Sequence, residues 1–127
     1  MIRGVRGATT VKQNEEKEII EATEELLRKM SEKNDYEPEH ISHIIITMTQ
    51  DLNAAFPAGA LRLIEGYQYV PVMCAQEVPV PGSLQYCIRI MCNIETNKNQ
   101  DEIQHVYLKN AVHLRPDLVL TNESKSR

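Results

Sequence analysis

The stretch QYCIRIMCNI, residues 85–94, has the alternating pattern of a β-strand that carries an arginine on one face. Successive side chains of a strand point to opposite faces, so the even-numbered residues from 86 to 92, all apolar or aromatic, share one face. Arg89 lies on the other face, between Cys87 and Met91. A guanidinium keeps its charge at any working pH, and a buried charge needs a partner. The stretch therefore predicts a strand whose arginine meets either a carboxylate or an anionic ligand.

A second strand-like run, residues 2–11, raises the same question for Arg6. Gly4 and Gly7 stand close to this arginine, and glycine within a strand lets another backbone or a ligand approach closely. The run predicts a second cationic side chain on a strand that other groups can reach.

The clearest helix in the sequence is NEEKEIIEATEELLRKMSEKN, residues 14–34. Asn14 suits the N-cap position, and the glutamates that follow it suit the positive end of the helix dipole. Apolar residues recur at helical spacing and form one stripe, which consists of Ile19, Ile20, Thr23, Leu26, Leu27 and Met30. We expect this stripe to pack on a sheet while the charged residues face solvent.

Shorter elements complete the pattern. The β-branched run at residues 43–49 predicts a strand buried on both faces. Pro57 is well placed to open a short helix, and residues 68–77 predict a strand that Pro71 interrupts. Residues 104–108 predict a last strand, followed by a helical turn. The order β-α-β-α-β-β-β indicates an α+β fold with helices on one face of a mixed sheet.

The composition is that of one ordinary globular domain. The chain has 127 residues, of which 42% are hydrophobic and 25% charged. We expect a single domain over residues 1–120 and a polar, disordered tail over residues 121–127. No apolar run approaches the roughly 20 residues that a membrane span needs, and no signal-peptide pattern opens the chain.

The net charge, the cysteines and the histidines argue against nucleic-acid-binding, disulfide-rich and metal-binding proteins. The net charge of −4 and the lack of a basic stripe argue against nucleic acid as a partner. The three cysteines lack Cys-x-x-Cys spacing, and the four histidines lack the spacing of metal ligands, so we expect no disulfide framework and no metal. These features favour a reduced, cytoplasmic protein.

Two interpretations of the arginines remain open from the residues alone. Arg6, Arg62, Arg89 and Arg115 can each extend to solvent or pair with a nearby carboxylate. Alternatively they form a pocket for a substrate that bears carboxylates, because the guanidinium fork matches carboxylate geometry. In such a pocket Glu77 would balance the charge or accept a hydrogen bond from a substrate hydroxyl. Glu77 is equally compatible with an exposed turn before VPVPG, residues 78–82.

The motifs that the chain lacks narrow the chemistry. It contains no Gly-x-Ser-x-Gly, no P-loop and no dinucleotide-binding fingerprint, and no Cys–His pair can be argued. If the protein is an enzyme, these absences favour a reaction that needs neither a covalent intermediate nor a proton shuttle.

Over residues 2 to about 120 the chain closely resembles the monofunctional chorismate mutases of the AroH class, the Bacillus type. The resemblance rests on five segments in matching order: IRGVRGATTV, FPAGALR, YQYVPVMCAQE, CIRIM and HVYLKNAVHLRPDL. It implies a chorismate-mutase-like fold with ferredoxin-like α/β layers, and a homotrimeric pseudo-barrel with active sites between subunits. It also implies an isomerase without a cofactor that converts chorismate to prephenate, at the branch of the shikimate pathway that leads to phenylalanine and tyrosine.

The resemblance assigns roles to individual residues. Arg89 matches the arginine that faces the breaking ether oxygen, and Arg6 matches the arginine that holds a substrate carboxylate. Tyr107 matches the tyrosine that donates to that carboxylate, and Glu77 matches the acid that contacts the ring hydroxyl. The remaining residues implied to line or cover the substrate are Phe56, Arg62, Met73, Cys74, Ala75, Gln76, Leu114 and Arg115.

Three departures from the family pattern are visible. Gly59 stands where the Bacillus type has a lysine, Met73 where it has a threonine, and Ala75 where it has a methionine.

Two alternatives to a mutase are an imine deaminase of the trimeric type that shares this architecture, and a non-catalytic module that binds an aromatic-pathway metabolite. The CAQE and CIRIM segments argue against the deaminase. Loss of chorismate absorbance distinguishes an enzyme from a binding module.

Overall fold

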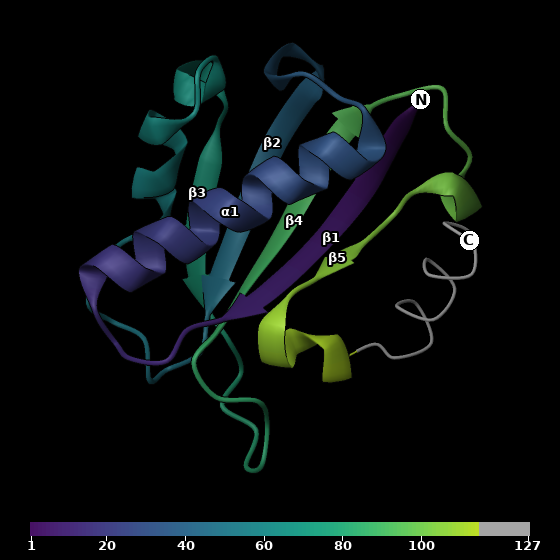
Figure 1. Cartoon of the computed structure of the whole chain (residues 1–127). Coiled ribbons are helices and arrows are strands. Elements are labelled where there is room, and N and C mark those ends of the chain that lie inside the picture. Colours follow the sequence, from purple (N-terminus) through teal and green to yellow (C-terminus); the bar gives the residue numbers. More distant parts are fainter. Residues whose placement is uncertain (115–127) are drawn as a thin grey trace.

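The computed structural model describes residues 1–114, which form a five-stranded sheet with one long helix across a face (Figure 1). The strands are β1 (Ile2–Thr10), β2 (Ile41–Met48), β3 (Val72–Gln76), β4 (Cys87–Glu95) and β5 (Val106–Tyr107), and the helix is α1 (Glu16–Asn34). Short 3₁₀ helices lie at Pro38–His40, Pro57–Leu63, Tyr67–Tyr69, Gln100–Glu102 and Lys109–His113. The predicted α+β fold with a mixed sheet is confirmed.

β4 is the middle strand of the sheet. The order across the sheet is β3-β2-β4-β1-β5. β4 runs antiparallel to both β1 and β2, whereas the outer strands β3 and β5 run parallel to their neighbours β2 and β1. In this register Arg89 of β4 lies beside Ala8 of β1 and Thr47 of β2. The strand predicted from QYCIRIMCNI therefore places its arginine at the centre of the sheet.

α1 covers one face of the sheet and buries the stripe predicted for it except Ile20, which is half-buried. Its buried residues are Ile19, Ala22, Thr23, Leu26, Leu27, Met30 and Asn34. Ile88 and Ile90 of β4 are buried on the same face, as the alternation within the strand predicts. A Cβ built on Gly7 would lie 2.4 Å from the sulfur of Met30, so this glycine allows α1 to pack close to β1.

The prediction that Asn14 caps α1 is wrong. The helix begins one residue later than such a cap requires, and its N-cap residue, Glu15, makes no side-chain capping bond. The Asn14 amide binds a distant loop instead. Its Oδ1 accepts hydrogen bonds from the backbone N–H groups of Asn53 and Ala54, each at 3.0 Å, and its Nδ2 donates to Asn53 Oδ1 at 2.7 Å. The hydrogen-bonding groups of the Asn14 side chain are therefore used in tertiary contacts and not in capping the helix.

The prediction that the run at residues 43–49 is buried on both faces is also wrong for the single chain. Ile44 and Ile46 face α1 and are buried, whereas Ile45, which points the other way, is 40% exposed. The reason is architectural: among the described residues α1 covers one face, and no second layer covers the other (Figure 1).

Two strands are shorter than predicted. β3 begins at Val72 because Tyr67–Tyr69 forms a 3₁₀ turn and Pro71 has no N–H to donate; the Pro71 carbonyl accepts a hydrogen bond from Ile44 N–H at 2.9 Å. β5 keeps two residues of the predicted 104–108, and the expected helical turn follows it at Lys109–His113.

Some predictions lie outside the described residues. These are the role of Arg115, the end of the domain at residue 120 and the disordered tail at residues 121–127. Within residues 1–114, no helix has both the length and the apolar character that crossing a membrane requires.

Thr9 provides a test of the core. It is fully buried on β1, and its hydroxyl has no hydrogen-bond partner among residues 1–114. Thr9→Val should raise the free energy of unfolding by about 1 kcal/mol, because a buried unpaired hydroxyl is costly. Urea denaturation at one fixed protein concentration measures the change. A lower midpoint with an unchanged slope would contradict the prediction.

The buried thiols predict a loss of stability at alkaline pH. Burial raises the pKa of Cys92 from 9.0 to about 11, and it raises that of Cys87 to about 11 despite the opposing positive charge of Arg89. The unfolded chain therefore releases these protons at lower pH than the folded chain. We expect the free energy of unfolding to be insensitive to these thiols below pH 9 and to fall between pH 9 and about 11.

Denaturation under reducing conditions across this pH range measures the slope. Cys92→Ala should make the fall shallower, whatever the variant's absolute stability. An identical slope in the variant would show that the Cys92 thiol does not contribute.

Candidate active site

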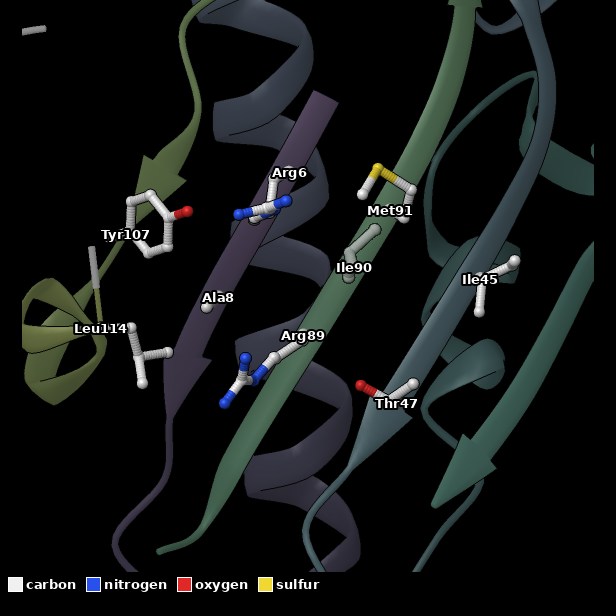
Figure 2. A pocket seen from close by; sticks show the side chains of 10 residues that line it. Arg6, Ala8, Ile45, Thr47, Arg89, Ile90, Met91, Tyr107 and Leu114 are labelled. Atoms are coloured by element: carbon white, nitrogen blue, oxygen red, sulfur yellow. The ribbon is translucent and has the colours of Figure 1, made fainter. Parts of the chain in front are cut away.

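A cavity of about 490 Å³ lies on the sheet face opposite α1 (Figure 2). Strands β1, β2, β4 and β5 and the turn after β5 all contribute to its wall. The residues that line it are Arg6, Gly7, Ala8, Ile45, Thr47, Arg89, Ile90, Met91, Tyr107 and Leu114. Two arginines and a tyrosine, far apart in the sequence, thus meet at one cavity.

Strand register explains why these side chains meet. Thr47, Arg89, Ala8 and Tyr107 are successive register partners on β2, β4, β1 and β5, so they form one row across the sheet. Arg6 lies two residues from Ala8 on β1 and therefore points to the same face. The small side chain of Ala8 leaves space between Arg89 and Tyr107, as Figure 2 shows. The cavity therefore follows from a small residue between two large ones.

Glu77, which follows the edge strand β3, forms an ion pair with Arg89. Its Oε1 lies 3.2 Å from Arg89 Nε, while its Oε2 accepts a hydrogen bond from the Thr47 hydroxyl. The Glu77 backbone N–H donates to the Met48 carbonyl at 2.8 Å, which fixes the residue at the end of β3. The carboxylate therefore offsets part of the positive charge of Arg89.

Two buried polar atoms at the cavity have no hydrogen-bond partner among residues 1–114: Arg89 Nε and the Tyr107 hydroxyl. The contact of Arg89 Nε with Glu77 is an ion pair whose geometry is not that of a hydrogen bond. Buried polar groups in native proteins are nearly always bonded, so unpartnered donors at a cavity indicate a site for an acceptor. A small anion with carboxylate groups fits two guanidinium groups and a phenol.

The backbone of Arg6 is tied to the residue that precedes β5. Its backbone N–H donates to His105 Nδ1 at 2.9 Å, two residues before Tyr107. This bond joins the edge strand to β1 and thereby places the Arg6 and Tyr107 side chains on the same wall of the cavity.

The remaining residues implied by the resemblance lie elsewhere in the chain. Successive residues of β3 point to opposite faces, so Cys74 and Gln76 face away from Arg89 and line a second cavity with Phe56 and Ala75. Arg62 is exposed and lines a further cavity together with Phe56 and Cys74. Met73 is 73% exposed and lines neither of these cavities.

The described chain therefore brings together Arg6, Arg89, Tyr107 and Leu114 in one cavity, with Glu77 in contact with Arg89. It does not bring Phe56, Arg62, Met73, Cys74, Ala75 or Gln76 to that cavity. The sequence analysis missed Thr47, because a threonine inside a β-branched run is an ordinary strand residue and its contact with Glu77 spans 30 positions.

The thiol nearest to the site is unsuited to nucleophilic catalysis. Cys87 is fully buried two residues from Arg89, and burial raises its pKa to about 11, so at neutral pH it is a protonated thiol. Among residues 1–114, no group of three or more His, Cys, Asp or Glu side chains is arranged to hold a metal ion.

The two guanidinium groups at this cavity suit a protein that binds a small anion. The model of the family "Chorismate mutase type I" matches residues 2–118, which is nearly the whole chain. The chain belongs to the chorismate mutase type I family.

Relatives of known identity match over almost their full lengths. The chorismate mutase AroH of Bacillus subtilis (strain 168) is 50% identical over 125 residues, which cover 98% of each chain. The chorismate mutase AroH of Thermus thermophilus is 50% identical over 119 residues, which cover 93% of this chain and 97% of the relative. A solved chorismate mutase from Clostridium thermocellum superposes with a TM-score of 0.83 at 48% identity, and the match covers 85% of this chain and 96% of that one.

Proposed function

We propose that this chain, an isomerase of the chorismate mutase family, rearranges chorismate to prephenate at the cavity that Arg6, Arg89 and Tyr107 line. The family places the protein in the biosynthesis of aromatic amino acids. The observation that carries the proposed site is the buried Tyr107 hydroxyl, which has no hydrogen-bond partner among residues 1–114, at one cavity with the guanidinium groups of Arg6 and Arg89.

The reaction matches the groups around the cavity. It is a unimolecular rearrangement of a dicarboxylate in which a carbon–oxygen bond breaks while a carbon–carbon bond forms, and no proton moves. The protein accelerates it by holding the compact conformer and by opposing the negative charge that develops on the ether oxygen. Neither a nucleophile nor a base is required, which agrees with the protonated thiol of Cys87.

Each polar group then has one task. Arg89 stabilises the ether oxygen as its charge develops, and Arg6 and Tyr107 bind a carboxylate of the substrate. Glu77 accepts a hydrogen bond from the ring hydroxyl. Because each of its oxygens already has one partner in the chain, this hydroxyl uses a remaining lone pair of the carboxylate.

The same proposal includes a homotrimer with active sites between subunits. Two features of the single chain support it. The Arg89 side chain is 43% exposed, although electrostatic catalysis requires a site that excludes water. In addition, the residues around Phe56 and Cys74 line a different cavity from Arg89, so one site can contain both groups only if two chains supply them. One chain contributes the wall with Arg6, Arg89 and Tyr107, and its neighbour contributes the wall with Phe56 and Cys74.

The substrate test is loss of chorismate absorbance on addition of purified protein. The mutase predicts turnover to prephenate. Calorimetric heat with a bicyclic transition-state analogue but no turnover would instead identify a binding module.

The three cysteines, none in a disulfide, accord with our proposal of a cytoplasmic location.

Arg89→Ala should lower kcat at least 100-fold and change KM much less, because the charge that it stabilises develops only in the transition state. Removal of one such donor commonly costs about 2.7–4 kcal/mol. Steady-state kinetics with chorismate measure the change. Arg28→Ala is the matched control, since Arg28 pairs with Glu24 on α1, on the other face of the sheet, and should retain wild-type kcat. A loss in Arg89→Ala below about tenfold would remove its proposed role.

Met73→Glu tests the assembly. Met73 is an exposed apolar side chain on the uncovered face of the sheet, so a glutamate there is tolerated by the single fold but not inside an interface. We expect the wild type to sediment at three times the 14.5 kDa chain mass, and the variant to dissociate and lose activity together. Tyr69→Glu is the control: Tyr69 is 88% exposed and lines a cavity with Glu37 and Glu39, which does not include Phe56 or Cys74. Dissociation of both variants, or of neither, would argue against this interface.

A further inference from the structure

We infer that Thr47 is a positioning residue for Arg89 and acts through Glu77. The inference rests on the proposed function of the cavity, and it assigns a role to a residue that does not itself carry charge. The Thr47 hydroxyl holds one oxygen of the Glu77 carboxylate, so that the other oxygen is the one turned toward the guanidinium.

The side chains of Thr47, Glu77 and Arg89 are linked by two contacts across three neighbouring strands. Thr47 of β2 is the register partner of Arg89 on β4, and Glu77 follows directly after β3, the strand on the other side of β2. The Thr47 hydroxyl donates to Glu77 Oε2, and Glu77 Oε1 lies 3.2 Å from Arg89 Nε. Each carboxylate oxygen therefore has a different partner.

Glu77 needs this anchor because its backbone alone does not determine where the carboxylate lies. The hydrogen bond from Glu77 N–H to the Met48 carbonyl, 2.8 Å long, fixes the backbone at the end of β3. Three side-chain torsions remain, and each has several rotamers. With the side chain only 18% exposed, the Thr47 hydroxyl selects one arrangement at the buried end.

The consequence concerns the donors of Arg89. A carboxylate and a guanidinium prefer a fork-to-fork pairing that uses both oxygens and two N–H groups. Because Thr47 holds Oε2, Glu77 approaches the guanidinium through Oε1 at Nε, the inner nitrogen. In Figure 2 the rest of the guanidinium extends away from Thr47, toward β1. Thr47 thus keeps the terminal nitrogens available for the substrate.

The test compares two substitutions at one position. Thr47→Val removes the hydroxyl and keeps the β-branched shape, whereas Thr47→Ser keeps the hydroxyl. We expect Thr47→Val to lower kcat for chorismate at least tenfold with KM changed less than about threefold, because Glu77 then competes for the terminal nitrogens of Arg89. Thr47→Ser should restore kcat to within about threefold of the wild type. Equal kcat for Thr47→Val and the wild type would overturn the inference.

A double-mutant cycle separates positioning through Glu77 from a general structural effect. If Thr47 acts through Glu77, then Thr47→Val should change kcat/KM less than about twofold once Glu77→Ala is present. If the two losses multiply, Thr47 acts by another route and the inference fails. Thr9→Val is the matched control, because Thr9 lies on the α1 face of the same sheet and should leave kcat unchanged.

The failure of this inference is distinguishable from failure of the proposed function. If the wild type does not consume chorismate, the proposed function is wrong. If the wild type turns over and Thr47→Val retains its kcat, the function stands and the role of Thr47 is wrong.

Discussion

The structure depends on keeping one permanent charge at the centre of a β-sheet. Arg89 lies on the middle strand, where it cannot leave the sheet, and a guanidinium does not lose its proton. One carboxylate, that of Glu77, balances this charge. Glu77 follows β3, two strands away from β4, and its Oε1 lies 3.2 Å from Arg89 Nε. Because this pairing is made at Nε, the terminal nitrogens of the guanidinium are left for another acceptor. Electrostatic stabilisation of a reacting oxygen requires such preorganised donors.

Dividing the sheet into two unlike faces makes this possible. α1 supplies a dry core on one side, where the even-numbered residues of β4 are buried. The other side carries the arginines, and Ala8 between Arg89 and Tyr107 leaves room for a ligand. A chain of this size has one substantial core. Placing that core on one face leaves the opposite face, with its cavity, uncovered within the described residues.

Local patterns succeeded where local physics decides the outcome. The period of two in QYCIRIMCNI separated Arg89 from the buried isoleucines, and the helical stripe from Ile19 to Met30 lies against the sheet as expected. The same reasoning failed at Asn14, whose amide binds a loop about 40 positions away, and at Ile45, whose face has no covering layer within the described chain. In both cases a contact distant in sequence, or the lack of one, outweighed the local preference.

The sequence by itself determined which segments become strands and helix and which face each side chain takes, because these properties depend on the period of near neighbours. Through its resemblance to a family it also indicated Arg6, Glu77, Arg89 and Tyr107. Only the tertiary structure decided that Thr47 meets Glu77, that Ala8 separates Arg89 from Tyr107, and that Phe56 and Cys74 line another cavity. Strand order and register decide these contacts, and both are set by packing between segments that lie tens of residues apart.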